Sequence, residues 1–167
     1  MISFSQPALK LASKIQEHVS LKGLIPLKPQ NSERAFATVQ NPLQLMATSA
    51  TIAPSSFGFV FIDSPRATTR SSVQLWTVDS EECGAIKTYT LSDPGYRFHL
   101  SANMLVTARY AKQCVSLNGI VAVTTNVDMS TIVKGAFETV FGYDGFLGEL
   151  VYQIRSGGGN DSRYMSV

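Results

Sequence analysis

The chain has 167 residues and a net charge of +2 at pH 7, and 44% of its residues are hydrophobic, enough to pack one core without metals or disulfides. Only 16% are Asp, Glu, Lys or Arg, against about 25% in an ordinary soluble domain, whereas 19 are Ser and 13 are Thr. This composition excludes a disordered chain and a highly charged helical bundle. It is typical of β structure that shows much of its surface to other proteins.

The basic residues are concentrated near the start of the chain. Residues 1–35 carry five basic and two acidic side chains, and the remainder carries nine basic and ten acidic ones. Such a segment indicates either an anionic partner or a solvated helix face. No stretch approaches the ~20 apolar residues of a membrane span, and no secretory signal is visible. We therefore expect a protein that is handled in the cytosol.

Residues 5–22 are predicted to form an amphipathic helix. Ser5 can cap it, Pro7 suits its first turn, and Gly23 suits its end. Its apolar residues recur at helical spacing and predict a docking face: Ala8, Leu11, Ala12, Ile15 and Val19. Two prolines then indicate a linker, so we expect an N-terminal arm over residues 1–35 and a β domain over 36–167.

From residue 36 onward, short strand-like runs alternate with turn residues. The predicted strands are Phe36–Gln40, Leu43–Ile52, Phe57–Ile62, Val73–Val78, Ala85–Leu91, Tyr96–Tyr110, Ile120–Thr125 and Leu147–Ile154. One short helix is predicted over Met129–Gly142, where apolar residues follow helical spacing. The end of the chain, Arg163–Val167, again has the pattern of a strand.

The longest predicted strand decides the fold class. Over Phe98–Tyr110 the apolar residues occupy the even positions and the polar ones the odd positions, with Leu105 the exception. Such alternation predicts an antiparallel sheet with one packed and one wet face. Because no helix-length crossover separates most strands, βαβ units are not expected. The sequence therefore predicts a mainly all-β fold, an antiparallel β-sandwich or jelly roll with an N-terminal helix and one inserted helix.

No active site emerges from the sequence. His18 and His99 lack metal-ligand spacing, and the two cysteines lack a C-x-x-C spacing, so free and mostly buried thiols are expected. A hydrolytic Cys114–His99 pair is a much weaker alternative, because no nucleophile motif flanks either residue. A charged turn is favoured over an oxygen-ligand cation site at one acidic cluster, Asp79, Glu81 and Glu82. We expect no enzyme, no cofactor and no metal.

One pattern is more specific. The motif Tyr96-Arg97-Phe98-x-x-Ser101-Ala102-x-Met104-x-Val106, followed by Leu117-x-Gly119-Ile120-Val121-Ala122, resembles coat proteins of small icosahedral RNA viruses of the nodavirus, tombusvirus and sobemovirus type. The resemblance covers about residues 36–126 and implies neighbouring strands of a capsid jelly roll. It departs from that family in lacking an Arg-rich arm and in leaving few residues for the last strands. Either the chain is a compact version, or it is one piece of a longer or cleaved precursor, which its strand-like end favours.

The resemblance implies a structural capsid protein that assembles with itself or with sibling capsid chains and encloses viral RNA without reading sequence. Its place would be the virion, and the host cytoplasm during assembly. The expected RNA contacts are the basic residues of the arm, Lys10, Lys14, Lys22, Lys28 and Arg34. Arg97 and Arg109, on the polar face of the long strand, are expected to meet a neighbouring subunit or the RNA. The rival hypothesis is a β-sandwich ligand-binding module, lectin-like or adhesin-like.

Overall fold

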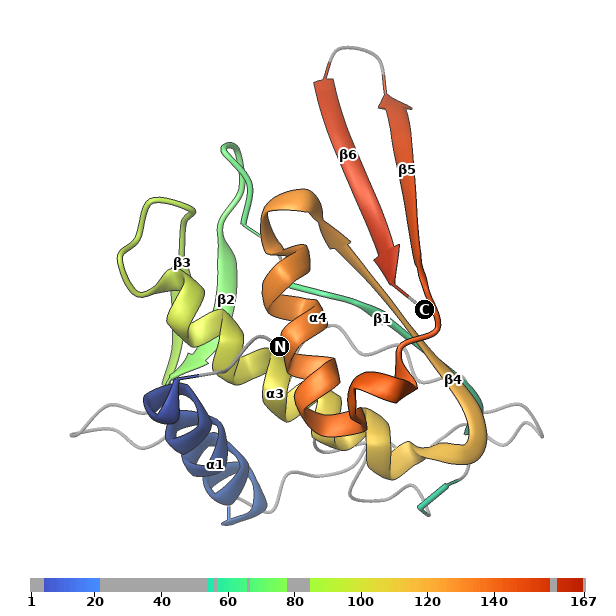
Figure 1. Cartoon of the computed structure of the whole chain (residues 1–167). Coiled ribbons are helices and arrows are strands. Elements are labelled where there is room, and N and C mark those ends of the chain that lie inside the picture. The colour runs from blue at the N-terminus through green and yellow to red at the C-terminus, as the bar shows by residue number, and fades with distance from the viewer. Residues whose placement is uncertain are drawn as a thin grey trace, which may run out of the picture.

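The computed structural model describes residues 5–21, 54–55, 57–65, 67–77, 85–156 and 159–166. Its helices are α1 (Gln6–Leu21), α3 (Tyr96–Cys114) and α4 (Val127–Phe141), with a short 3₁₀ helix, η1 (Tyr143–Gly145). Its strands are β1 (Phe57–Asp63), β2 (Val73–Thr77), β3 (Ala85–Tyr89), β4 (Val115–Asn126), β5 (Glu149–Ser156) and β6 (Gly159–Ser166) (Figure 1). The fold is mixed α/β, so the prediction of an all-β jelly roll or sandwich is wrong.

The error arises at residues 96–110, which form most of α3 instead of a strand. Alternation predicted one wet face, yet the polar side chains of Asn103 and Thr107 are as buried as their apolar neighbours. Their polar groups are paired inside the protein, and Thr107 Oγ1 donates to the Asn103 carbonyl at 2.9 Å. In a helix that is enclosed on most sides, apolar residues do not have to recur at helical spacing. The alternation of apolar and polar residues therefore did not distinguish a half-buried strand from a buried helix.

The strands form two sheets. One has the order β1-β4-β6-β5, in which β1 runs parallel to β4 while β6 is antiparallel to both β4 and β5. The other is the antiparallel hairpin of β2 and β3. The chain leaves β1, forms this hairpin and α3, and returns as β4 beside β1. This helix-containing crossover between parallel neighbours is the type of connection that the sequence pattern had excluded.

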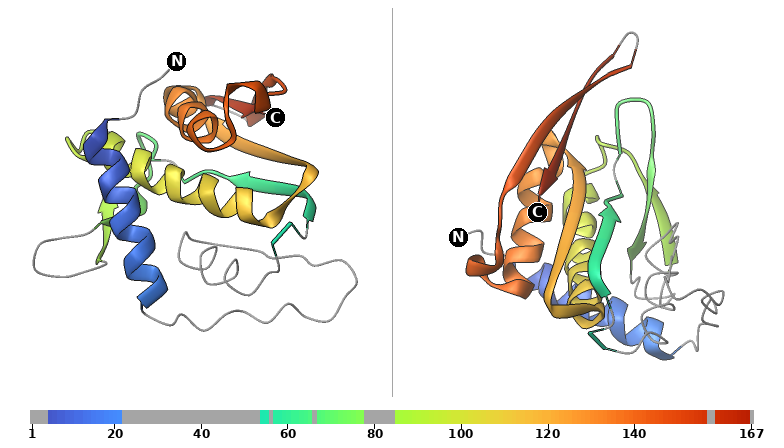
Figure 2. Two further views of the ribbon diagram at one scale, coloured as in Figure 1. Left: turned by 60° about the horizontal axis from the view of Figure 1, so that its bottom comes forward. Right: turned by 90° about the vertical axis from the view of Figure 1, so that its right-hand side faces the viewer.

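Helix α3 is the centre of the hydrophobic core. Figure 2 shows it in the middle of the fold, with α1 and α4 packed against it. The cluster of buried side chains draws on several elements: Leu11 and Ile15 of α1, Leu75 and Trp76 of β2, Leu100, Met104 and Leu105 of α3, Val123 of β4, and Met129 and Val133 of α4. The apolar face of α1 predicted from the sequence is therefore docked on the same core as α3.

Most other elements lie where the sequence predicted them. Both predicted helices are present, as α1 and α4. Five predicted strands overlap β1, β2, β3, β4 and β5, and the strand-like end of the chain lies in β6. Two predicted strands, Phe36–Gln40 and Leu43–Ile52, lie outside the described residues. Local patterns thus located the short elements well, while the assignment of the central one failed.

Candidate functional site

One exposed aromatic surface of the described residues lies on β1. Phe59 is 59% exposed and Phe61 is 56% exposed, although both belong to a strand of the main sheet. Their neighbours Val60 and Ile62 alternate with them and are half-buried, and Ile62 packs on the core. One face of β1 therefore covers the core, while the opposite face presents two aromatic rings to solvent. Large exposed aromatic side chains of this kind are typical of interaction surfaces.

Strand β1 is also the edge of its sheet among the described strands. It pairs with β4, with Phe59 opposite Ile120, Phe61 opposite Ala122 and Asp63 opposite Thr124. The Asp63 carboxylate accepts a hydrogen bond of 2.6 Å from Thr124 Oγ1, which ties the only charge of the strand to its neighbour. Edge strands of this kind, apolar and nearly uncharged, are templates for pairing with another chain.

The sequence predicted this strand but not its exposed face. Alternation alone shows that Phe57, Phe59 and Phe61 share a side. It does not show which side the rest of the chain covers, because that depends on where α3 packs. The aromatic residues on one side of the strand, together with its single charge, are the only indication of an exposed face that the sequence offers.

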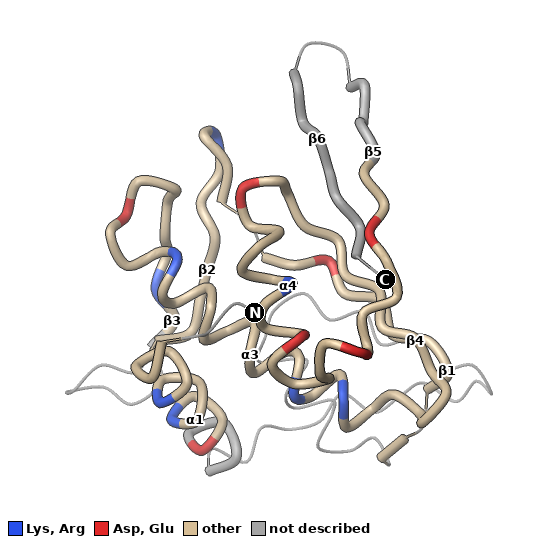
Figure 3. The backbone as a smooth tube through the Cα atoms, in the orientation of Figure 1, with Lys and Arg blue, Asp and Glu red and all other residues tan. Residues whose placement is uncertain are grey.

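Two of the predicted RNA contacts lie on α1. Lys10 and Lys14 are exposed, one turn apart, on the side of α1 that faces away from the buried Leu11 and Ile15. Figure 3 marks the lysines of this helix in blue. The other three predicted contacts, Lys22, Lys28 and Arg34, lie outside the described residues. The structure therefore brings together one pair of cations, which are open to solvent.

Arg97 and Arg109 do not share a face, as the strand prediction had placed them. They are twelve residues apart on α3, which corresponds to about 18 Å along the helix. Arg97 is exposed in the first turn. Arg109 is half-buried, and its Nη1 donates to Gln16 Oε1 of α1 at 3.0 Å. Arg109 thus fastens α1 to α3, and only Arg97 is open to a partner.

The Cys114–His99 pair is excluded by the helix. The two residues lie at opposite ends of α3, fifteen residues and about 22 Å apart. Cys114 is buried, and burial raises the pKa of its thiol, which keeps the thiol protonated at neutral pH. Within the described ranges, no group of three His, Cys, Asp or Glu residues could hold a metal ion. The acidic cluster Asp79, Glu81 and Glu82 and the second cysteine, Cys83, lie outside these ranges.

No protein-family model matches the sequence, and no curated protein matches it significantly. The segment that carries the coat-protein resemblance divides in the structure. Tyr96–Val106 is helical, while residues 117–122 belong to β4. None of the helices in the described part of the chain has both the length and the apolar stretch that a membrane crossing needs. The case for a function therefore rests on the surfaces of this chain.

Proposed function

We propose that this chain is a structural protein that acts by associating with copies of itself, and that its assembly is the RNA-enclosing shell expected from the sequence. The observation that carries the proposal is the pair of exposed rings, Phe59 and Phe61, on the edge strand β1. A low content of charge supports it, because charged residues are depleted in the cores of protein interfaces. The jelly-roll architecture is no part of this proposal.

The sequence of β1 is suited to pairing with itself. When two copies of β1 lie antiparallel about Val60, Phe59 of each copy stands opposite Phe61 of the other. Residues directly opposite in an antiparallel pair share a face, so the four exposed rings form two cross-strand aromatic pairs. Such a contact uses the same surface on both copies and has twofold symmetry. Pairing of this kind joins the sheets of two subunits into one.

Charge favours this antiparallel arrangement over a parallel one. In the antiparallel pair the two Asp63 carboxylates lie at opposite ends of the paired segment, about 20 Å apart. That separation exceeds the Debye length of about 8 Å at physiological salt, so their repulsion is screened. A parallel pair would bring the two carboxylates side by side. The single charge of the strand thus selects the direction of pairing.

The contact through β1 alone is small. The exposed parts of four Phe side chains amount to roughly 450 Å². A stable interface usually buries 1,200–2,000 Å², so this contact by itself would be weak. Leu150 and Val151, 59% and 62% exposed, lie on β5 at the opposite edge of the sheet and provide further apolar surface. Several weak contacts per subunit are expected of a shell that assembles as the protein concentration rises.

The RNA part of the proposal rests on Lys10 and Lys14, whose ammonium groups are open to solvent on α1. Two such groups make weak contacts with phosphates, and these contacts do not depend on the nucleotide sequence of the RNA. RNA is therefore expected to bind mainly to the assembled particle, in which many copies present their lysines at once.

Sedimentation and electron microscopy of the full chain test the proposal. The wild-type protein should gain mass with concentration and form uniform particles. The double variant Phe59→Thr/Phe61→Thr keeps β-forming residues but removes the rings, so it should stay monomeric over the same range. Ile86→Thr, which removes a 42% exposed side chain from the β2–β3 hairpin, is the matched control and should assemble normally. A wild-type protein that stays monomeric, or a double variant that assembles equally, would overturn the proposal.

A further inference from the structure

A polar cleft lies where three helices meet. Both α1 and α4 pack against α3, and the cleft between them has a volume of about 440 Å³ and is open to solvent. Sites that bind small molecules usually have roughly 300–1,000 Å³, so the cleft has the size of such a site. Each of the three helices contributes to its polar lining: Gln16 of α1, Arg109, Lys112 and Gln113 of α3, and Thr139 and Val140 of α4.

The charge of this cleft is positive. Arg109 and Lys112 are three residues apart on α3, so their side chains are neighbours on one side of the helix. Among the described residues that line the cleft, none is Asp or Glu. A cleft lined by charges of one sign attracts ligands of the opposite sign, so this cleft is suited to an anion.

Both cations retain hydrogen-bond donors for a ligand. Arg109 Nη1 donates to Gln16 Oε1 at 3.0 Å, while a guanidinium group carries five N–H donors. Lys112 Nζ donates to the Val140 carbonyl oxygen at 2.6 Å, while an ammonium group carries three donors. Both acceptors are neutral, so they hold the two side chains in place without neutralising their charges.

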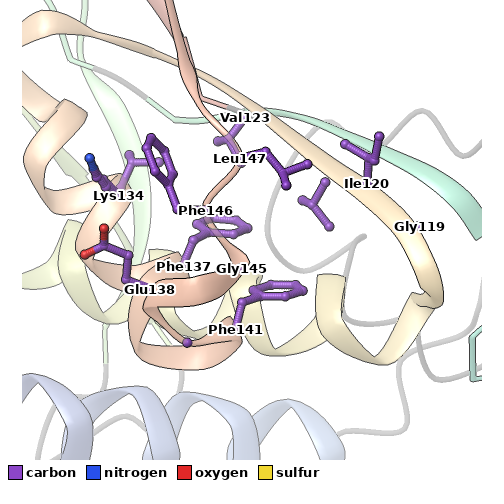
Figure 4. Close-up of a pocket in the computed structure, with 13 residues that line it drawn as sticks. Gly119, Ile120, Val123, Lys134, Phe137, Glu138, Phe141, Gly145, Phe146 and Leu147 are labelled. Carbon is purple, nitrogen blue, oxygen red and sulfur yellow. The ribbon is translucent and has the colours of Figure 1, made fainter.

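The acidic residues closest in sequence to the lining lie outside the cleft. Glu138 lines a different, apolar cavity of about 100 Å³, beside Phe137 and Phe146. Figure 4 shows its carboxylate on the side of α4 that carries Lys134. Glu17 is exposed on α1 and does not line the cleft. Neither acid therefore reduces the positive charge of the lining.

We propose that this cleft binds a small phosphorylated molecule through its phosphate group. The Arg109 guanidinium and the Lys112 ammonium group donate to the phosphate oxygens. Such charge-assisted hydrogen bonds are roughly twice as strong as those between neutral groups. The exposed side chain of Gln113 lines the same cleft and offers an amide to the rest of the molecule.

The position of Arg109 favours a small molecule over an RNA chain. Arg109 is half-buried and bonded to Gln16, so it is closed to a neighbouring subunit or a polynucleotide, whereas a small molecule can enter the cleft. Gln16 and Lys14 lie on opposite sides of the buried stripe of α1, so the cleft is separate from the lysines proposed to contact RNA. The inference therefore does not depend on the self-association or the RNA binding proposed above.

Titration of the full-length chain with adenosine monophosphate (AMP) and with adenosine tests the proposal, because the two probes differ only in the phosphate group. The backbone amide NMR signals of Gln113 and Thr139 should show saturable shifts with AMP and none with adenosine. Lys112→Gln should weaken AMP binding at least about tenfold, as expected for the loss of a hydrogen bond between charged groups. Lys134→Gln makes the same change outside the cleft and should leave the affinity unchanged.

Two further variants separate charge from folding. Lys112→Arg keeps the charge and a donor for the Val140 carbonyl, so it should retain most of the affinity. Thr139→Glu adds a carboxylate at an exposed position of the lining, so it should abolish AMP binding while the protein stays folded.

Three results would show that the proposal is wrong. The first is a wild-type protein without saturable shifts in AMP, and the second is equal affinity for AMP in the wild type and Lys112→Gln. The third is displacement of AMP by an RNA oligonucleotide that has no terminal phosphate, because the cleft would then take the RNA backbone instead of a small molecule.

Discussion

The side chain of Asn103 on α3 forms the two hydrogen bonds with the Trp76 backbone on β2 that a neighbouring strand would otherwise form. Asn103 Oδ1 accepts a hydrogen bond of 3.0 Å from the Trp76 backbone N–H, and Asn103 Nδ2 donates to the Trp76 carbonyl at 2.9 Å. Both residues are almost fully buried. A backbone that would otherwise need another strand is thus satisfied by one amide, which fixes the β2–β3 hairpin on the central helix.

Replacing this amide should be costly. Asn103→Ala removes the amide that pairs with the buried N–H and C=O of Trp76, at a cost of about 1–3 kcal/mol for each group, so we expect a loss of roughly 2–6 kcal/mol in the free energy of unfolding. Urea unfolding measures it. Thr107→Val is the control, because Thr107 Oγ1 donates to a helical carbonyl within α3, and its loss should cost under about 1.5 kcal/mol. Equal losses in the two variants would contradict the bridging role.

Gly119 should not tolerate a side chain. An added Cβ would lie 2.6 Å from Val115 Cγ2, 2.9 Å from the Phe57 carbonyl oxygen and 3.0 Å from that of Gly58. Because two of these atoms belong to the backbone of β1, Gly119→Ala should force β1 and β4 apart and cost about 1–3 kcal/mol. Gly148→Ala, where nothing lies within 4 Å, is the matched control for the same change. Thermal unfolding of both variants gives the comparison.

Stability should fall at alkaline pH because of two buried acids. Burial raises the pKa of the Tyr96 hydroxyl and of the Cys114 thiol, so the folded state retains protons that the unfolded chain loses near pH 10 and about pH 8.5. The stabilisation that these two groups contribute is complete below their pKa values in the unfolded chain. It is lost as the pH rises through their higher pKa values in the folded state.

Tyr96→Phe isolates the phenol in this profile. The variant loses the hydrogen bond that Tyr96 Oη accepts from the Ala67 N–H at 3.0 Å, so it should be less stable at pH 7. Above about pH 10 its free energy of unfolding should fall less steeply than that of the wild type. Tyr143→Phe removes a hydroxyl from a 69% exposed residue and should leave the slope unchanged. A parallel fall in the wild type and Tyr96→Phe would rule out a role for Tyr96.

RNA binding should depend on the two exposed lysines of α1. Lys10→Gln/Lys14→Gln removes at most two phosphate contacts, so the slope of log K against log salt for single-stranded RNA should become shallower by about 1.4. Fluorescence anisotropy with an RNA oligonucleotide measures the slope, and Arg70→Gln, at another exposed cation, is the control. Deleting the arm would not serve, because Leu11 and Ile15 of α1 are buried in the core. An unchanged slope would place the RNA contacts elsewhere.

The sequence by itself determined the elements whose patterns are local. Helix α1 was found from its cap, its first-turn proline and its apolar stripe, and α4 from its helical spacing. The short strands were bounded by turn residues such as Asp63-Ser64-Pro65, because tight turns require particular residues whatever the surrounding fold. The exposure of Lys10 and Lys14 also followed from the apolar stripe of α1, because side chains outside the buried face of a helix point to solvent.

Only the tertiary structure decided the identity of α3 and the faces of β1. Alternation at residues 96–110 is compatible with a half-buried strand or with a helix covered on most sides, and the choice depends on α1, α4 and β2 packing around it. Once α3 is the core, it covers Ile62 and leaves Phe59 and Phe61 outward. The cavity beside Phe137 likewise depends on where the loop after Gly142 places Phe146. These features rest on contacts between segments distant in the chain, which hydrophobic periodicity does not encode.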